Sequence, residues 1–267
     1  MAQSGSGSGS ATHYVRFEQG GATSYGILDG DSIQPIGGDL FGDRAPSGDP
    51  VDLGDVKLLY PCDPPKVLCV GLNYKSHLGE RIPPETPEIF YKPPSALLDP
   101  GGEIVIPAGA KDVHYEAELV IVIGREAKSV SVENAANHIF GYTCGNDVSD
   151  RNWQNGTKGD QKDVQWWRAK GADTFGPLGP SIATAFDYDK ARIQLRLNGQ
   201  VKQSQLVSDL LFGPAQIVSH VSHFVTLSPG DVIYTGTPGS TSPMKAGDVV
   251  EVEIDGIGIL KNTVSSG

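Results

Sequence analysis

The chain has 267 residues and a formal net charge of −11 at pH 7, so it can form one large domain, or a main domain with a small extension, around a buried core. Its acidity argues against nucleic acid or a membrane surface as a partner, because both are negatively charged. Three cysteines without Cys-x-x-Cys spacing argue against a disulfide framework or a zinc cluster and favour the reducing cytoplasm, and no apolar run reaches the roughly 18 residues of a membrane span.

The N-terminal part divides into a polar tail and a run of short strands. Residues 1–12, rich in Gly and Ser, lack the hydrophobic core of a signal peptide, and we expect a disordered tail. Residues 13–60 alternate short apolar stretches with glycine turns, which predicts a small β subdomain. Residues 61–267 then form the main domain. Many short strands, few helices and several glycine turns predict a β-rich α+β fold.

A buried strand over residues 66–70 runs into a segment with a histidine and a carboxylate. Residues 75–80 can form one helical turn, which would place His77 and Glu80 three positions apart on one face. A carboxylate beside an imidazole fixes its tautomer and raises its basicity, as a general base requires. A weak salt bridge on an exposed helix is the alternative interpretation. Residues 81–90 contain three prolines and predict an irregular loop.

Two carboxylates enter an apolar, β-branched run at residues 114–123, HYEAELVIVI. Because side chains alternate in a strand, Glu116 and Glu118 should share one face with Val120 and Val122. Like charges in a dry setting are costly unless a cation or basic groups compensate them, and a hard divalent metal is the simplest compensator. A solvated acidic face is the alternative, against which the apolar continuation argues.

A third carboxylate follows in residues 141–154, GYTCGNDVSDRNWQ. The segment starts as a short strand, and its Gly-Asn pair predicts a turn that presents Asp147 at the strand end. Glu116, Glu118 and Asp147 would make an all-oxygen site with open positions. Such a site suits Mg²⁺ or Mn²⁺ better than Zn²⁺.

The C-terminal part is β-rich, with one predicted helix at 210–224. This helix carries His220 and His223, a rival metal pair, but no third ligand with suitable spacing lies nearby, and we treat both as ordinary helix residues. A strand over 231–236 leads to Thr237 in a Pro-Gly turn, whose hydroxyl and backbone N–H groups could hold a carboxylate. A plain structural turn is the alternative.

Two hairpins complete the pattern. An Asn-Gly pair within the alternating residues 193–203 predicts a type I′ turn, and residues 248–260 predict a closing hairpin. Glu251 and Glu253 repeat the Glu-x-Glu pattern there. They have no third acid nearby, and we interpret them as the solvated face of that hairpin.

Five segments, in this order along the chain, resemble the fumarylacetoacetate hydrolase family: GLNYKSHLGE (71–80), the Glu-x-Glu strand, NDVSDR (146–151), RAKGADTFGPLGP (168–180) and YTGTPG (234–239). Any one of these motifs alone is weak evidence for the family, whereas all five in the family's order are strong evidence. The resemblance covers about residues 60 to 262. It implies a mixed β-sheet roll or sandwich with a small N-terminal β subdomain, assembled as a homodimer.

The resemblance also implies roles for individual residues. Metal ligands would be Glu116, Glu118 and Asp147, catalytic residues His77, Glu80 and Lys170, and substrate-binding residues Arg151, Gln154 and Thr237. In this scheme His77 and Glu80 activate a water molecule, Lys170 stabilises an enolate, and Thr237 takes the near carboxylate of the substrate. Residues 81–90 correspond to a mobile lid. Lys92 lies in a Lys-Pro segment, where it is a further basic candidate or a packing residue.

The implied activity is metal-dependent hydrolysis of a C–C bond in a small 2-oxo acid, of the acylpyruvate or fumarylpyruvate type. The same groups can decarboxylate oxaloacetate, interconvert its keto and enol forms, or isomerise hydroxy-diene diacids, and the sequence leaves these reactions open. Two hypotheses come from other classes: a non-catalytic homodimeric module, and a zinc hydrolase built on His220 and His223.

Overall fold

The computed structural model describes residues 11–267, so most of the predicted N-terminal tail lies outside the described residues. The first strand, β1, begins at Thr12, one residue before the predicted boundary of the β subdomain. Thr12 pairs with Thr184 of a strand in the main domain.

Within residues 11–267 the chain forms twenty strands and four α-helices. The strands are β1 (Thr12–Gln19), β2 (Ala22–Asp29), β3 (Ser32–Gly38), β4 (Arg44–Pro46), β5 (Val51–Asp52), β6 (Lys57–Leu59), β7 (Val67–Gly71), β8 (Glu88–Lys92), β9 (Leu97–Leu98), β10 (Glu103–Ile106), β11 (Val113–His114), β12 (Ala117–Ile123), β13 (Ile139–Asn146), β14 (Ser149–Asp150), β15 (Gly176–Thr184), β16 (Arg192–Leu197), β17 (Gln200–Leu206), β18 (Val232–Tyr234), β19 (Val249–Ile254) and β20 (Gly258–Ser266). The helices are α1 (Lys75–Leu78), α2 (Val132–Ala135), α3 (Arg151–Asn155) and α4 (Pro214–Phe224).

The strands of the described chain belong to three sheets. The largest has thirteen strands, with the main order β4-β3-β2-β1-β15-β13-β12-β18-β7-β8, while β5, β6 and β9 pair at its sides. A five-stranded sheet has the order β10-β20-β19-β16-β17, and β11 pairs with β14. Both parallel and antiparallel pairs occur in the largest sheet. The predicted β-rich α+β fold with mixed sheets is therefore confirmed.

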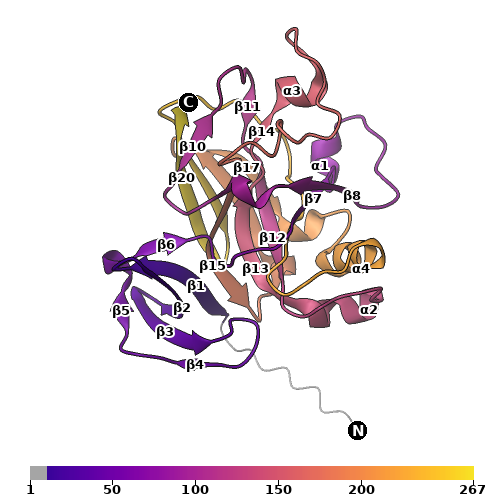
Figure 1. Ribbon diagram of the computed structural model, residues 1–267. Helices are drawn as coiled ribbons and strands as arrows, with labels where there is room; N and C mark the ends of the chain where they lie inside the picture. The colour runs from indigo at the N-terminus through magenta and orange to yellow at the C-terminus, as the bar shows by residue number, and fades with distance from the viewer. Residues whose placement is uncertain (1–10) are drawn as a thin grey trace.

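Strand β12 lies at the centre of the molecule, and its two faces belong to different cores (Figure 1). Leu119, Ile121 and Ile123 pack in the core that also contains the five-stranded sheet and α4. Val120 and Val122 pack in a second core on the other face. All are fully buried, and each such side chain contributes about 1.5–3 kcal/mol relative to exposure. The predicted alternation of this strand is confirmed.

The N-terminal strands continue the large sheet rather than forming a separate layer. β1 pairs with β15 of the main domain, with β2 and with β6, and Figure 1 shows these strands at one end of the molecule. A small core of their own contains Val15, Phe17 and Ile33. The small N-terminal β subdomain is thus present and is joined to the main domain through backbone hydrogen bonds.

Two local predictions from the C-terminal part are confirmed. The Asn-Gly pair joins β16 to β17, with φ of 51° at Asn198 and 76° at Gly199, as a type I′ turn requires. The predicted helix appears as α4, which begins at Pro214 and is preceded by a 3₁₀ turn. Its buried face packs into the main core.

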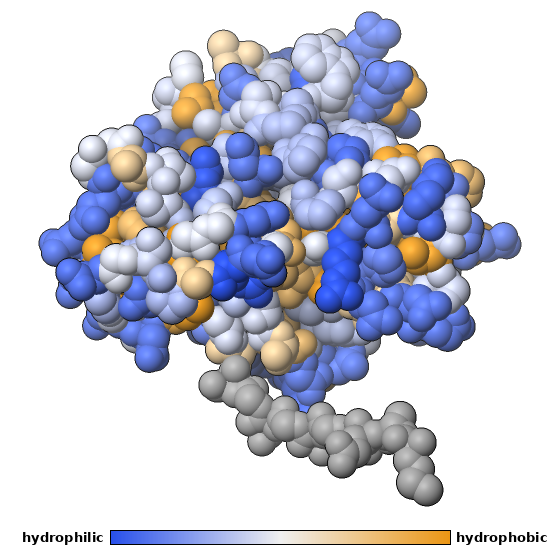
Figure 2. Space-filling model, turned by 60° about the horizontal axis from the view of Figure 1, so that its bottom comes forward, coloured by the Kyte–Doolittle hydropathy of each residue, from blue (hydrophilic) through white to orange (hydrophobic). Residues whose placement is uncertain are grey.

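No helix within the described residues is long and apolar enough to cross a membrane. On the face shown in Figure 2, hydrophilic side chains predominate and the apolar ones are scattered.

Candidate functional site

The ends of several central strands enclose a cavity of about 500 Å³. β12 begins there and β13 and β18 end there, because β12 runs antiparallel to both, while β7 ends beside β18 as its parallel neighbour. Eight of the nine predicted site residues line this cavity: His77, Glu116, Glu118, Asp147, Arg151, Gln154, Lys170 and Thr237. Glu80 is not among the lining residues.

The register between β12 and β13 brings the three acidic residues together. Ala117 pairs with Asn146, so the neighbouring Glu116 and Asp147 face each other, and the Asp147 N–H donates to the Glu116 carbonyl oxygen at 2.9 Å. Glu116, Glu118 and Asp147 each offer one oxygen, and these oxygens lie within 4.8 Å of one another. All three residues are buried.

Glycine is required where β13 approaches this site. A Cβ built on Gly145 would collide with the ring of Tyr234 and the side chain of Val120. Strands β12, β13 and β18 can therefore pack closely enough to converge on the acidic residues only with glycine at this position.

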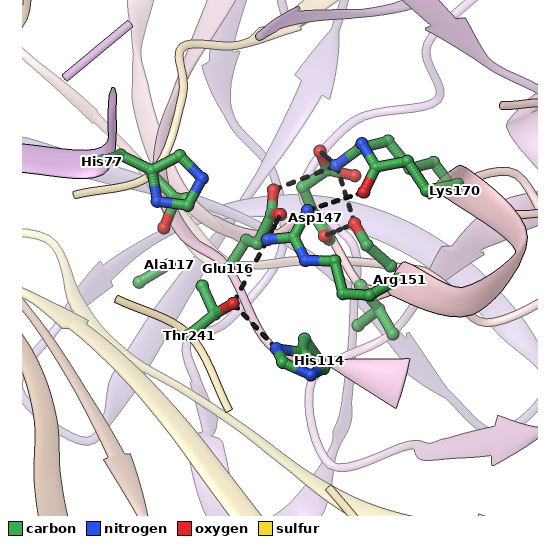
Figure 3. A network of polar contacts seen from close by, with 12 residues as sticks. His77, His114, Glu116, Ala117, Asp147, Arg151, Lys170 and Thr241 are labelled. Carbon is green, nitrogen blue, oxygen red and sulfur yellow. Dashed lines mark hydrogen bonds and ion pairs between the residues drawn. The ribbon is translucent and has the colours of Figure 1, made fainter. Parts of the chain in front are cut away.

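Three cations lie among the carboxylates, and two of them, Arg151 and Lys170, are labelled in Figure 3. Lys170 Nζ lies 3.0 Å from Glu116 Oε2 and 2.6 Å from Asp147 Oδ2. Arg151 forms an ion pair with Glu116 Oε1, and Lys92 Nζ lies 2.6 Å from Asp147 Oδ1. Glu116 and Asp147 each contact two cations, so their negative charge is largely neutralised by the protein.

Glu118 differs from the other two carboxylates. Its Oε2 accepts the Gly236 N–H at 2.6 Å, but no ion pair joins it to a cation within residues 11–267. Burial, followed by the charges of Asp147 and Glu116, raises the pKa of Glu118 well above its ordinary value. Burial also acts to raise the pKa of Glu116, but its neighbouring cations, Arg151 first, outweigh this effect and lower it.

The donor set fits a hard divalent cation. Three carboxylate oxygens within 4.8 Å of one another are the ligands that Mg²⁺ and Mn²⁺ take in proteins. The ionised form of Glu118 would have no cationic side chain of the described chain to neutralise it, as expected of a ligand whose compensating charge is a bound metal. No other group of three or more His, Cys, Asp or Glu residues with metal-ligand spacing occurs in the described chain.

We expect divalent-metal binding to release a proton and to strengthen with pH. In the metal-free protein the raised pKa of Glu118 keeps this carboxyl protonated above the ordinary value of about 4.3, and a metal binds only its ionised form. The apparent affinity should therefore rise with pH up to the raised pKa of Glu118 and level off above it. Calorimetric Mn²⁺ titrations in buffers of different ionisation enthalpy measure the released proton. A proton count of zero across this range would contradict the assignment of Glu118 as a ligand.

His77 reaches the cavity from α1, which follows β7. Its Nδ1 lies 2.6 Å from the carbonyl oxygen of Gly239. Because a carbonyl only accepts hydrogen bonds, Nδ1 carries a proton, and this contact selects the tautomer of the neutral ring in which Nε2 is the acceptor. In Figure 3 the imidazole lies on the opposite side of the network from Lys170. The geometry therefore supplies an oriented histidine, with a backbone carbonyl in the place predicted for a carboxylate.

Glu80 is not brought together with His77. Helix α1 ends at Leu78, and Gly79 has a φ of 61°, so the chain leaves the helix before Glu80, which is exposed. The expectation that both residues share one helical face is therefore wrong for this structure. No hydrogen bond or ion pair joins the two side chains in the part of the chain described. The proposed role of Glu80 stays a prediction.

Arg151 and Gln154 lie on α3 and contact each other, Arg151 Nη1 donating to Gln154 Oε1 at 2.7 Å. Arg151 Nη2 also donates to Thr241 Oγ1 at 3.2 Å, and this oxygen lies 2.8 Å from His114 Nδ1. Thr241 lines the cavity as well. Neither Thr241 nor His114 was predicted as a site residue, because a loop threonine and a strand histidine far apart in sequence carry no local signal.

Two further contributors were missed or underestimated. Lys92 is fully buried, and its Nζ donates to the carbonyl oxygen of Phe175 at 2.9 Å and also to that of Lys170. The hydroxyl of Ser149 accepts from Lys170 Nζ at 2.7 Å. Lys92 therefore acts at the metal ligands rather than only packing. In the sequence, Lys92 is a lysine at the end of a strand, followed by two prolines. A lysine on the protein surface can have the same local pattern, so the sequence did not indicate that Lys92 is buried at the site.

The rival histidine pair does not form a metal site among the described residues. His223 Nδ1 lies 2.7 Å from the Ser219 carbonyl oxygen within the same helix, and His220 stacks near Phe224. Both residues lie on α4.

Comparisons with known proteins identify the family to which the chain belongs. The family model for the fumarylacetoacetate (FAA) hydrolase C-terminal domain matches residues 66–265, and an Rv2993c-like N-terminal model matches residues 12–61. The mitochondrial oxaloacetate tautomerase fahd2 of Xenopus laevis is 39% identical over 223 residues, which cover 79% of this chain and 69% of the relative.

Solved structures extend the similarity to the whole fold. The 5-carboxymethyl-2-hydroxymuconate delta-isomerase of Mycobacterium smegmatis has 41% identity and a TM-score of 0.88, covering 96% of this chain and 100% of the other. Maleylpyruvate hydrolase of Sphingobium sp. in complex with manganese(II) and pyruvate has 29% identity and a TM-score of 0.78, covering 96% and 99%. From the matched domain and these relatives, the chain belongs to the fumarylacetoacetate hydrolase family.

Proposed function

We propose that this protein is a divalent-metal-dependent enzyme that moves a proton on small 2-oxo dicarboxylates, as a keto-enol tautomerase or a hydroxy-diene-dioate isomerase. The observation that carries the proposal is the convergence of three carboxylates, three cationic side chains (Arg81, Arg151 and Lys170) and one oriented histidine on a single cavity, with Glu80 outside its lining. Proton transfer needs one base and a stabilised enolate. Hydrolysis needs an activated water molecule in addition.

Glu116, Glu118 and Asp147 would hold the metal, which supplies Lewis-acid polarisation of the 2-oxo group when bound. His77 Nε2 is the acceptor that takes a proton from the carbon beside the oxo group and returns it in the reverse direction. Lys170 uses its three N–H donors on Glu116, Asp147 and Ser149, so it stabilises the enolate charge through its field.

The remaining lining residues orient the substrate. The Arg151 guanidinium, held by Gln154 and Thr241, retains donors for the distal carboxylate of a dicarboxylic acid. Thr237, in the turn that follows β18, would bind the carboxylate next to the oxo group. Both carboxylates of a dicarboxylic substrate would thus have hydrogen-bond donors in the cavity, although the protein as a whole is acidic.

C–C bond hydrolysis of an acylpyruvate is the second candidate function. The likeness to maleylpyruvate hydrolase, whose structure contains manganese and pyruvate, favours it, and His77 would then activate water. In the scheme that the family resemblance implies, Glu80 also contacts His77, which would need the segment after α1 to move. A homodimer remains our expectation for either function, and sedimentation or light scattering would measure it.

Parallel turnover assays distinguish the candidates. The metal-loaded protein is assayed with Mg²⁺ or Mn²⁺ on enol oxaloacetate, a hydroxy-diene-dioate and acetylpyruvate, with enol absorbance and pyruvate both followed. Accelerated loss of the enol of oxaloacetate without pyruvate, or shift of the diene absorbance, supports the proposal. Pyruvate from oxaloacetate indicates a decarboxylase, and pyruvate with acetate from acetylpyruvate indicates the hydrolase. No turnover with bound metal would favour a non-catalytic module, and activity that survives Glu116→Ala would favour a zinc enzyme.

Substitution of His77 by alanine should lower turnover by roughly 10²–10⁴-fold, the usual contribution of a general base. Metal binding should be intact, because His77 is not a ligand, and Mn²⁺ titration followed by thermal unfolding checks this. Glu80→Ala is the matched variant. If the enzyme is a tautomerase, this substitution should change turnover little, whereas if it is a hydrolase, the rate of hydrolysis should fall. Unchanged turnover in His77→Ala would exclude this residue as the base.

A further inference from the structure

Gln203 is a buried amide on an otherwise exposed strand. It lies on β17, the edge of the five-stranded sheet, where the other residues are exposed or half-buried and Gln203 alone is buried, at 4% exposure. A buried amide needs hydrogen-bond partners for both ends. It was not predicted as a site residue.

Its partners connect two parts of the candidate site. Gln203 Oε1 accepts the N–H of Ala117, the residue between the two glutamates of β12, at 3.1 Å. Gln203 Nε2 donates to Thr237 Oγ1 at 2.8 Å and to the Pro238 carbonyl oxygen at 2.6 Å. One side chain therefore joins the acidic strand to the turn that carries Thr237.

These contacts fix the direction of every hydrogen bond. The Ala117 N–H can only donate and the Pro238 carbonyl can only accept, so two backbone groups determine which end of the Gln203 amide is oxygen. Both hydrogens of Nε2 are then used, and Thr237 Oγ1 must accept one of them. The hydrogen of the Thr237 hydroxyl is consequently free to point elsewhere, and Thr237 lines the cavity.

We propose that Gln203 is a positioning residue that holds the Thr237 hydroxyl as a hydrogen-bond donor toward the carboxylate of the bound substrate. A hydroxyl otherwise donates or accepts with equal ease. The hydrogen bond from Gln203 takes one of the two lone pairs of Thr237 Oγ1. The hydroxyl hydrogen is then directed to another acceptor, so that an anionic oxygen is favoured over a group that donates. The inference rests on the proposed function only for the identity of the carboxylate, and any anion with a carboxylate oxygen at this position would be selected in the same way.

The first test is Gln203→Met, which keeps the length of the side chain and removes its donors. The Thr237 hydroxyl is then released, and the Pro238 carbonyl, which has lost its donor, competes for its hydrogen. Loss of a hydrogen bond to a charged group corresponds to roughly a 10- to 100-fold weaker Kd or KM. We expect this change in KM and in the Kd of oxalate measured with Mn²⁺ present, with kcat and the Kd of Mn²⁺ alone nearly unchanged. Oxalate binding needs no turnover, so it tests the inference even if the proposed reaction is wrong.

Gln205→Met is the matched control. Gln205 lies two positions along the same strand, and its Nε2 donates to Asp209 Oδ2 at 2.8 Å away from the cavity. The Gln205→Met variant should bind oxalate as tightly as the unmodified protein does. Equal weakening in both variants would mean that strand stability, rather than the hydroxyl of Thr237, is affected, and would overturn the proposal.

A double-mutant comparison decides whether Gln203 acts through Thr237. Thr237→Val removes the hydroxyl, so adding Gln203→Met to it should weaken oxalate binding no further. Additive losses would overturn the proposal. If Gln203→Met does not fold, Gln203→Glu provides the second test: its carboxylate still accepts from Ala117 but accepts the Thr237 hydrogen as well, and oxalate binding should again weaken while the Kd of Mn²⁺ alone stays within a few-fold. Oxalate binding equal to that of the unmodified protein in Gln203→Glu would likewise overturn it.

Discussion

Replacing Glu118 by glutamine is expected to abolish metal-dependent turnover while making the metal-free protein more stable. Glu118 is the buried carboxylate without a cationic partner in the described chain, and its pKa is raised by burial and by Asp147 and Glu116. Glutamine retains an oxygen that can accept the Gly236 N–H and removes the ionisable group. The change thus deletes a charged metal ligand without emptying the space.

The stability gain should depend on pH in a defined direction. A carboxyl whose pKa is higher in the folded than in the unfolded protein loses stability as pH rises from its unfolded value of about 4.3 up to its folded value. Glu118→Gln removes this loss. Its advantage in unfolding temperature over the unmodified metal-free protein should therefore be small at acidic pH and grow toward higher pH. An advantage that shrinks with rising pH would contradict the raised pKa.

Adding metal should have the opposite effect on the relative stability of the two proteins. Mn²⁺ at 100 times its Kd should stabilise the unmodified protein by about 2.7 kcal/mol, and Glu118→Gln should show little of this shift. Glu253→Gln is the matched control, because Glu253 belongs to the second Glu-x-Glu pattern but pairs with Arg196 at 2.6 Å. Equal Mn²⁺ stabilisation in Glu118→Gln would show that the acidic cluster is not the metal site.

The sequence was most informative where local rules decide the structure. Alternation along β12 placed Glu116 and Glu118 on one face, and the Gly-Asn pair placed Asp147 at a strand end. These rules operate within a few residues. Their convergence, by contrast, depends on the register between β12 and β13 and on the close approach that Gly145 permits, and neither follows from the pattern of one strand alone.

The predictions that were incomplete depend on contacts distant in sequence or on a single backbone torsion. The positive φ of Gly79 ends α1 and separates Glu80 from His77, and helical spacing alone does not report it. Lys92 reaches Asp147 across 55 positions of sequence and has the local pattern of a surface lysine. Gln203 lies in a strand whose other side chains are not buried, so nothing in its neighbourhood indicates a buried amide.

Replacing Lys170 by methionine is expected to lower turnover by roughly 10²–10³-fold, the usual cost of removing one preorganised electrostatic partner of a developing anion. Burial acts to lower the pKa of Lys170, but Asp147 and Glu116 outweigh it and raise it, so the side chain is a fixed positive charge at neutral pH. Methionine keeps the length and apolar stem while removing that charge. Steady-state kcat with saturating metal measures the loss.

The same substitution should change stability in a way that reports the metal. Without Lys170, Glu116 and Asp147 each lose one of two cationic contacts, and breaking a buried ion pair by removing one partner costs about 3–5 kcal/mol. A divalent cation supplies positive charge to the same carboxylates. The Mn²⁺-induced rise in unfolding temperature should therefore be larger in Lys170→Met than in the unmodified protein, even though the variant is the slower enzyme.

Lys92→Met separates the two effects. Lys92 contacts Asp147 as well but does not line the 500 Å³ cavity, so its removal should also destabilise the metal-free protein and increase the stabilisation by Mn²⁺. Turnover should fall less than in Lys170→Met, because the lost charge lies farther from the substrate. Equal losses of kcat in the two variants would mean that Lys170 acts only by holding the carboxylates in place, and that the charge stabilising the enolate comes from another group in the cavity.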